Sequence, residues 1–139
     1  MENLVTKSDM SDLPKIVAID FDGTLVEDNF PEIGTPYPEM FDLVKQLQTQ
    51  GVKVILWTCR DGYHLSDAVH YCCSEWGIIF DAVNQNVREV QGLFNNDTRK
   101  VYADLYIDDK AIPHVMSPSF WAERLGLRYS VLGGLNNGL

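Results

Sequence analysis

Cysteine and basic residues are scarce in this chain of 139 residues, and each shortage disfavours a class of function. The three cysteines include no C-x-x-C pair, so neither a zinc knuckle nor a disulfide framework is indicated. Lys and Arg number 11 against 20 Asp and Glu, which gives a formal net charge of -9. A surface of this charge repels phosphate backbones and anionic lipids, so nucleic acid is disfavoured as a partner.

Long apolar runs are also missing. No stretch approaches the length of a transmembrane helix, and the segment before Pro14 contains no apolar core of signal-peptide length. We therefore expect no membrane partner and a cytoplasmic location. Hydrophobic residues still make up 45% of the chain, enough for a core. The length suits one domain, placed at residues 14–132 between a flexible N-terminal arm (1–13) and a loose C-terminal tail (133–139).

Short apolar, β-branched runs bounded by Gly and Pro predict the strands of that domain. They lie at residues 15–20, 52–57, 78–83 and 103–108. Because the strands are nearly all apolar and helical patterns separate them, they predict a parallel sheet covered on both faces. The expected fold class is α/β, with a three-layer Rossmann-like arrangement around a central parallel sheet.

Two helical patterns are clear. Residues 38–51 begin at Pro38, which suits a first helical turn, and residues 65–76 stop at Gly77. Residues 84–98 are polar and weakly patterned, so they are predicted as a long loop with at most one helical turn. A helix at 118–125 and a short strand at 127–132 are predicted to close the domain.

Polar residues follow three of the four predicted strands at their carboxyl ends, where open α/β sheets bind ligands. They are Asp20, Asp22, Thr58, Arg60, Asp108 and Asp109. Four carboxylates at one edge repel one another unless a proton or a cation intervenes. A hard divalent ion such as Mg²⁺, shared between carboxylates, waters and substrate phosphate, is the natural solution. We therefore expect a metal site at this edge.

The spacing of Asp20 and Asp22 adds a chemical possibility. In an extended segment, residues i and i+2 point the same way, about 6.5 Å apart. One carboxylate can therefore attack a phosphoryl group while the other serves the leaving-group oxygen. The Thr58 hydroxyl and the backbone amides around Gly23 are candidates to hold phosphoryl oxygens, and Lys100 is a candidate to offset their charge.

Four motifs in order carry a resemblance to a known family. They are D-F-D-G-T at residues 20–24, an apolar strand ending in Thr58, Lys100, and a strand ending in D-D at 108–109. In this order they resemble the haloacid dehalogenase (HAD) superfamily over roughly residues 16–112. The resemblance implies a HAD-type fold and a phosphomonoesterase that uses Mg²⁺ and an aspartyl-phosphate intermediate.

The resemblance also implies roles for the four carboxylates. Asp20 resembles the nucleophile that becomes phosphorylated. Asp22 resembles the general acid for the leaving group and then the base for the hydrolytic water, with its backbone carbonyl on the metal. Asp108 and Asp109 resemble the remaining metal-binding pair, one of them bound directly and the other through water; the sequence leaves open which.

The phosphate-binding residues follow from the same resemblance. Thr58 matches the second motif and Lys100 the third, although the neighbouring Arg99 is an alternative for the lysine's role. Arg60 resembles an arginine of members without a cap domain, including phosphatases that act on nucleic-acid ends. The sequence favours equally that Arg60 binds substrate and that it pairs with Asp61.

No cap domain is expected. In this superfamily a cap follows the first motif or precedes the lysine, and the corresponding segments here, 25–39 and 84–98, are too short. An open site with a small flap near residues 26–36 follows. The expected substrate is a nucleotide or another small phosphate ester. The alternatives are a nucleic-acid-end phosphatase and a non-catalytic protein of this fold that binds a phosphorylated ligand.

Three further residues lie close to the predicted edge. Asn84 and Asn86 follow the third strand and either contact the substrate or cap the strand end; the sequence favours neither. Cys59 lies next to Thr58, and we expect it to pack rather than react.

Overall fold

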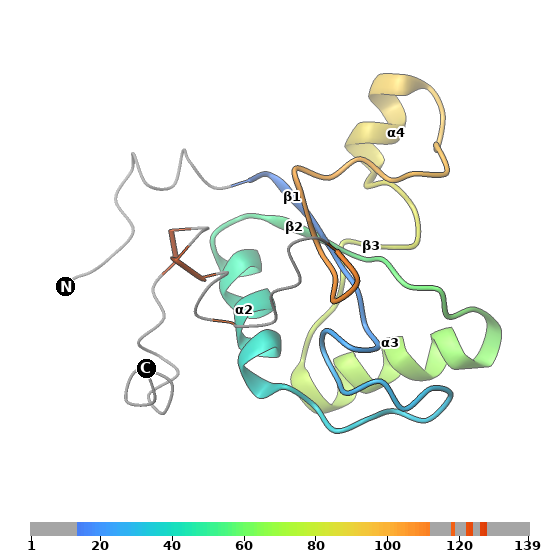
Figure 1. Cartoon of the computed structure of the whole chain (residues 1–139). Helices are drawn as coiled ribbons and strands as arrows, with labels where there is room; N and C mark the ends of the chain where they lie inside the picture. Colours follow the sequence, from blue (N-terminus) through green and yellow to red (C-terminus); the bar gives the residue numbers. More distant parts are fainter. Residues whose placement is uncertain (1–13, 112–117, 119–121, 124–125, 128–139) are drawn as a thin grey trace.

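The computed structural model describes residues 14–111, 118, 122–123 and 126–127. Its helices and strands, shown in Figure 1, are β1 (Ile16–Ile19), α2 (Pro38–Thr49), β2 (Lys53–Leu56), α3 (Gly62–Trp76), β3 (Ala82–Val83), α4 (Arg88–Phe94) and β4 (Leu105–Ile107). The strands form one parallel sheet in the order β3-β2-β1-β4. The predicted α/β Rossmann-like fold is therefore confirmed.

Side chains of β1 point alternately to the two faces of the sheet, and each face packs against helices, which gives three layers. Val17 and Ile19 face a core built with α2 and α3, whereas Ile16 and Ala18 face a smaller core that includes Val90 of α4. Figure 1 shows α2 and α3 on one side of the sheet and α4 on the other. Because both faces are covered, all four residues of β1 are buried and the strand is apolar throughout.

The helices α2 and α3 follow the predicted patterns. α2 begins at Pro38, as predicted. α3 begins at Gly62, three residues earlier than predicted, and ends before Gly77, which has a left-handed conformation. Two hydrogen bonds, from Gly77 N to Cys73 O and from Ile78 N to Cys72 O, close the end of α3. The first of these bonds is the one that usually accompanies a left-handed glycine at the end of a helix.

The predicted strand at 78–83 is wrong over its first four residues. Ile78 completes the end of α3, and Ile79 is 75% exposed. Asp81 is bonded to β2, but partly through its side chain: its N–H donates to Val54 O at 2.8 Å, and its Oδ2 accepts the Val54 N–H at 2.7 Å. The apolar composition predicted a six-residue strand, yet only Ala82 and Val83 belong to β3, and Ile78 closes the end of α3.

The segment at 84–98 contains a helix of seven residues, α4, where a loop with at most one turn was predicted. Val90 is the only buried residue of α4, so no helical periodicity was visible in the sequence. Asn86 orders the surrounding loop because its Nδ2 donates to Asp97 Oδ1 at 2.9 Å and its Oδ1 accepts the Tyr102 N–H at 2.6 Å. The buried Asn86 therefore connects this loop to the segment before β4, which differs from the strand-end cap that the sequence suggested as one alternative.

The two segments where a cap would lie contain no domain in the described residues. Between β1 and α2 the chain forms a loop with isolated bridges of Val26 to Asp22 and to Pro36. Between β3 and β4 it contains only α4. Within the described part of the chain, no helix has the length and apolar character needed to cross a bilayer.

The C-terminal predictions fall mostly outside the described residues. Pro118, Ala122 and Glu123 are helical, and Ala122 belongs to the larger core. The rest of the predicted helix at 118–125, all but one residue of the predicted strand at 127–132, and both the arm and the tail lie outside them.

Candidate functional site

The carboxyl ends of β2, β1 and β4 lie side by side, as expected. Ile19 of β1 is opposite Ile107 of β4, and the next residue, Asp20, donates its N–H to Ile107 O at 3.0 Å. On the other side, the Trp57 N–H donates to Ile19 O at 2.9 Å. Asp20 is therefore placed between the ends of two neighbouring strands, and the backbone ladder fixes its position.

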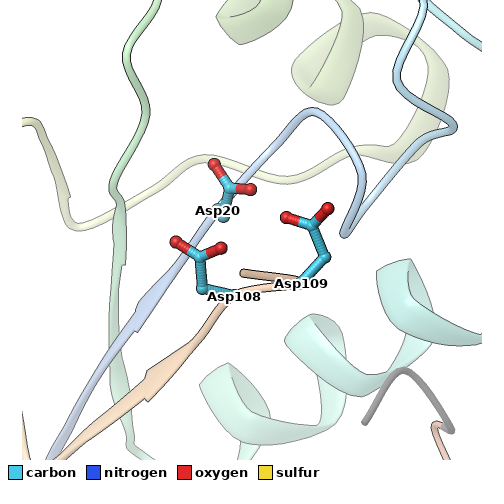
Figure 2. Close-up of side chains that lie close together, drawn as sticks. All are labelled: Asp20, Asp108 and Asp109. Carbon is cyan, nitrogen blue, oxygen red and sulfur yellow. The ribbon is translucent and has the colours of Figure 1, made fainter. Parts of the chain in front are cut away.

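Three carboxylates share a small space at this edge. Oxygens of Asp20, Asp108 and Asp109 all lie within 4.8 Å of one another. Figure 2 shows Asp20 at the end of β1 and the other two at the end of β4, with their carboxylates gathered at the same edge. Residues almost ninety positions apart in the sequence are therefore brought together by one parallel strand pair.

Asp109 fits a bound cation. Its side chain is 14% exposed, and its Oδ1 is buried without a hydrogen-bond partner in the described residues. An unpaired buried carboxylate oxygen is costly, so a cation at this point would satisfy it. The three neighbouring ligands are all carboxylate oxygens, the donor type that Mg²⁺ prefers. The residues present therefore fit a hard divalent ion.

Gly23 makes room for that arrangement. It has a φ of 87°, and a Cβ added there would lie 2.7 Å from Asp109 Cγ, closer than carbon atoms approach. The Gly23 N–H donates to Val26 O at 2.8 Å. The loop itself therefore uses the Gly23 N–H, and the expectation that amides around Gly23 hold phosphoryl oxygens stays a prediction for the neighbouring amides. The glycine is needed for its lack of a side chain.

Thr24 joins the two halves of the site, a role that sequence reasoning missed. Its buried hydroxyl donates to Asp20 Oδ2 at 3.2 Å and accepts the Asp109 N–H at 3.1 Å. Thr24 is the last residue of the D-F-D-G-T motif, but the sequence does not reveal its contact with Asp109, 85 residues away. Thr24 thereby fixes both carboxylate-bearing segments relative to each other.

Burial raises the pKa of Asp20 from 3.8 to about 7, and the negative charge of Asp108 adds to the effect. The charge of Asp109 also raises the pKa of Asp20, while the hydrogen bond from Thr24 lowers it. Without a cation, Asp20 therefore takes up a proton as the pH falls through about 7. A group so placed gains from any positive charge that enters the site.

Asp22 has a different partner and is not part of the carboxylate group. Both of its oxygens accept hydrogen bonds from Arg60, from Nε to Oδ2 and from Nη2 to Oδ1, each at 2.7 Å. Neither interpretation of Arg60 from the sequence describes this contact: the guanidinium is buried against Asp22, 38 residues away, instead of pairing with Asp61 or lining the cavity beside Asp20. Its planar fork matches a carboxylate in two parallel bonds.

Thr58 lies where the sequence placed it. A cavity of about 230 Å³ at the strand ends is lined by Asp20, Trp57, Thr58, Cys59 and Asp108. Larger hollows, of about 400 and 500 Å³, lie elsewhere and contain none of these residues. The cavity therefore brings Thr58 and two aspartates around one space.

Asn84 fixes the loop that carries Thr58. Asn84 Oδ1 accepts the Thr58 N–H at 2.8 Å, and Thr58 Oγ1 in turn accepts the Arg60 N–H at 3.1 Å. Of the two possibilities left open for Asn84, the structure shows the capping one. Among the described residues the Thr58 hydroxyl acts as an acceptor only, which leaves its proton for another acceptor.

Lys100 does not line the cavity at the strand ends. Its side chain is exposed, and its Nζ lies 5.3 Å from the centroid of the Tyr106 ring, two residues before Asp108. Within the described ranges, neither Lys100 nor Arg99 forms an ion pair. The structure therefore leaves the proposed phosphate contact of Lys100 as a prediction.

A similar structure is known. The solved structure of a conserved protein coded by a locus of Bacteroides thetaiotaomicron matches with a TM-score of 0.72 and 34% sequence identity, over 82% of this chain and 90% of that chain. The chain therefore belongs to the same family as that conserved protein. A scan against protein-family models and a search of curated proteins each gave no match.

Proposed function

We propose that this chain is a Mg²⁺-dependent phosphohydrolase that cleaves a small phosphate ester, with nucleotides as the first candidates, through an aspartyl-phosphate on Asp20. The observation that carries the proposal is the group of three carboxylates beside a cavity, in which Asp109 Oδ1 is buried without a hydrogen-bond partner among the described residues. The resemblance of the four ordered motifs to the HAD superfamily supports the same reaction.

Asp20, Asp108 and Asp109 are the residues that would hold Mg²⁺, joined by the Asp22 backbone carbonyl that the resemblance implies. The ion would supply positive charge that offsets the phosphoryl oxygens and the crowded carboxylates. Thr24 keeps two of the ligand-bearing segments in register, and Gly23 keeps the Asp109 carboxylate in place.

In the first step, an Asp20 oxygen attacks the phosphorus atom and the bond from phosphorus to the ester oxygen breaks. Asp22 enters this step protonated on one oxygen, with Arg60 keeping its bond to the other, and gives the proton to the departing oxygen, so the product leaves as an alcohol. The Thr58 hydroxyl donates to a phosphoryl oxygen, since its own oxygen already accepts the backbone N–H of Arg60. The chain is then an acyl phosphate at Asp20.

In the second step, water attacks the phosphorus atom of that acyl phosphate. Asp22, now a carboxylate, takes the proton of the water, and the bond between phosphorus and Asp20 breaks. Inorganic phosphate leaves and both carboxyl groups return to their starting states. The net reaction is ester plus water to alcohol plus phosphate.

The cavity supports a small substrate. Its volume of about 230 Å³ is below the range of roughly 300–1,000 Å³ that is usual for ligand sites. It therefore suits a phosphoryl group with part of its leaving group. Trp57 lines the same space and offers an aromatic surface beside the phosphoryl position, which favours a substrate with a ring.

The test is a substrate panel with and without Mg²⁺. p-Nitrophenyl phosphate, nucleoside monophosphates, sugar phosphates and a 3′-phosphorylated oligonucleotide are assayed with the wild type and Asp20→Asn. We expect Mg²⁺-dependent phosphate release that Asp20→Asn abolishes. Ligand binding without turnover of any ester would favour the binding-protein alternative. Fastest turnover of the oligonucleotide would favour a nucleic-acid-end phosphatase.

A further inference from the structure

Arg60 is buried, and every N–H of its guanidinium is used within the chain. It is 2% exposed. Nε and Nη2 each donate to Asp22, and Nη2 also donates to Glu32 O at 2.9 Å. Nη1 donates to Pro31 O at 3.1 Å and to His64 O at 3.2 Å. With all five donors engaged, the role of Arg60 in this arrangement is to join parts of the protein.

Two aromatic rings enclose the same guanidinium. Arg60 Cζ lies 5.1 Å from the ring centroids of both Phe21 and Phe30. The Phe30 ring also packs edge-on against His64, with centroids 5.2 Å apart. Cation–π contact of this kind adds to the hydrogen bonds and restricts the guanidinium to one plane.

These contacts connect three segments: the end of β1 through Asp22, the loop at residues 26–36 through two carbonyls and Phe30, and the start of α3 through His64. A buried guanidinium is stable only with its partners in place, so a shift of the loop must move Arg60 as well. Because Arg60 binds both oxygens of Asp22, the direction of that carboxylate would change with it.

We propose that Arg60 is a positioning residue that fixes the direction of the Asp22 carboxylate and couples it to the loop at 26–36. The proposal rests on the proposed function, in which Asp22 transfers the proton. It differs from direct substrate binding because Arg60 acts through Asp22 and through the loop. The loop thereby gains an influence on proton transfer without contacting the phosphoryl group.

The consequence depends on the leaving group. A nitrophenolate departs without a proton, whereas an alkoxide needs one from Asp22. Disturbing Arg60 should therefore slow an alkyl phosphate far more than p-nitrophenyl phosphate. Arg60→Lys is the sharpest variant, since lysine keeps the charge but cannot form two parallel bonds to a carboxylate.

The kinetic test compares kcat/KM of the wild type and Arg60→Lys on both esters. The ratio of alkyl to nitrophenyl rates should fall by at least about tenfold. In an Asp22→Asn background, Arg60→Lys should change that ratio by less than about twofold, because the residue through which it acts is gone. An equal loss on both esters, or an undiminished loss in the Asp22→Asn background, overturns the proposal.

A milder variant covers the case in which Arg60→Lys fails to fold. Phe30 is 53% exposed and touches Arg60 from the loop, so Phe30→Leu should lower the same ratio by a smaller factor. Tyr63→Leu is the matched control, because Tyr63 is 80% exposed on α3. A fall in the ratio for Tyr63→Leu as large as that for Phe30→Leu contradicts the coupling.

Hydrogen exchange tests the coupling without turnover. The Glu32 N–H donates to Asn29 O at 2.9 Å inside the loop. Asp22→Asn should speed exchange of this amide by about tenfold. Asp20 forms no hydrogen bond with Arg60, so Asp20→Asn should leave the exchange rate of this amide unchanged. Equal exchange in all three proteins overturns the proposal. Absence of wild-type turnover on every ester would count against the proposed function, and this measurement would still decide the coupling.

Discussion

Asp20 and Asp22 are separated by a single residue, yet their surroundings are opposite. Asp20 lies with two other carboxylates, and burial raises its pKa to about 7. Asp22 lies in the fork of a buried arginine that binds both of its oxygens. Among the described residues Asp20 has no positive partner, so it gains from a cation, whereas Asp22 is bonded to the cationic side chain of Arg60. The motif therefore supplies two identical groups, and the loops around them assign different chemistry to each.

The largest effect expected from breaking this contrast is the loss of Asp20. Asp20→Asn removes the proposed nucleophile but keeps the shape of the site, so turnover of p-nitrophenyl phosphate should fall on the order of 10⁴ or more. Steady-state kinetics with Mg²⁺ and a melting curve for each protein provide the measurement. Turnover that survives in a folded Asp20→Asn protein would show that a group other than Asp20 attacks the phosphorus atom.

Loss of Asp22 should be smaller and selective. Asp22→Asn removes the proton donor, so kcat for an alkyl phosphate should fall by about 10² to 10⁴, and for p-nitrophenyl phosphate by less. The rates are compared at saturating Mg²⁺. If both esters lose the same factor, Asp22 has no separate role in proton transfer and the contrast with Asp20 fails.

Gly23→Ala should weaken the cation site specifically. The new Cβ would meet the Asp109 carboxylate, so the Kd for Mg²⁺ should rise by at least about tenfold. Gly51→Ala is a matched control: Gly51 has a φ of 89°, almost equal to the 87° of Gly23, and has open space where its Cβ would be. Both variants bear the left-handed strain of roughly 1–2 kcal/mol. Equal Mg²⁺ affinity in the two variants would contradict the steric argument.

A last effect concerns stability, and its sign follows from Asp20. Because the folded pKa of about 7 exceeds the ordinary 3.8, the native state binds a proton that the unfolded chain releases. In EDTA, the contribution of Asp20 to stability is therefore fully present below about pH 4 and is lost as pH rises toward 7.

Melting temperatures of the wild type and Asp20→Asn between pH 4 and pH 8 measure this effect. The difference between the two proteins should grow in favour of Asp20→Asn as pH rises, and Mg²⁺ should reduce it at pH 8. A difference that is independent of pH would mean that Asp20 has no raised pKa in the folded protein.

Much of the fold could be predicted from the sequence because its signals are local. β1 is a short, wholly apolar run, and parallel strands align their carboxyl ends, so the approach of Asp20 to Asp108 and Asp109 could be predicted as well. The segment at 78–83 could not be predicted, because an apolar run does not reveal whether it pairs with a strand or closes a helix. α4 was hidden because only one of its residues is buried.

The partners of the site residues could not be predicted because they depend on the paths of loops. Arg60 meets Asp22 only because the loop at 26–36 folds over it and supplies two carbonyls. The need for Gly23 appears only once the position of Asp109 is known. In each case the residue was recognised from a motif, but its contact lay far away in the sequence.

The central claim is that Asp20 accepts the phosphoryl group, and reductive trapping tests it most directly. The wild type is mixed with p-nitrophenyl phosphate and Mg²⁺, quenched in acid and treated with borohydride, which converts an aspartyl-phosphate into homoserine. Peptide mass spectrometry should then find homoserine at position 20, and only when Mg²⁺ was present. Turnover with no homoserine, or with homoserine at position 22 or 108 instead, would contradict the account.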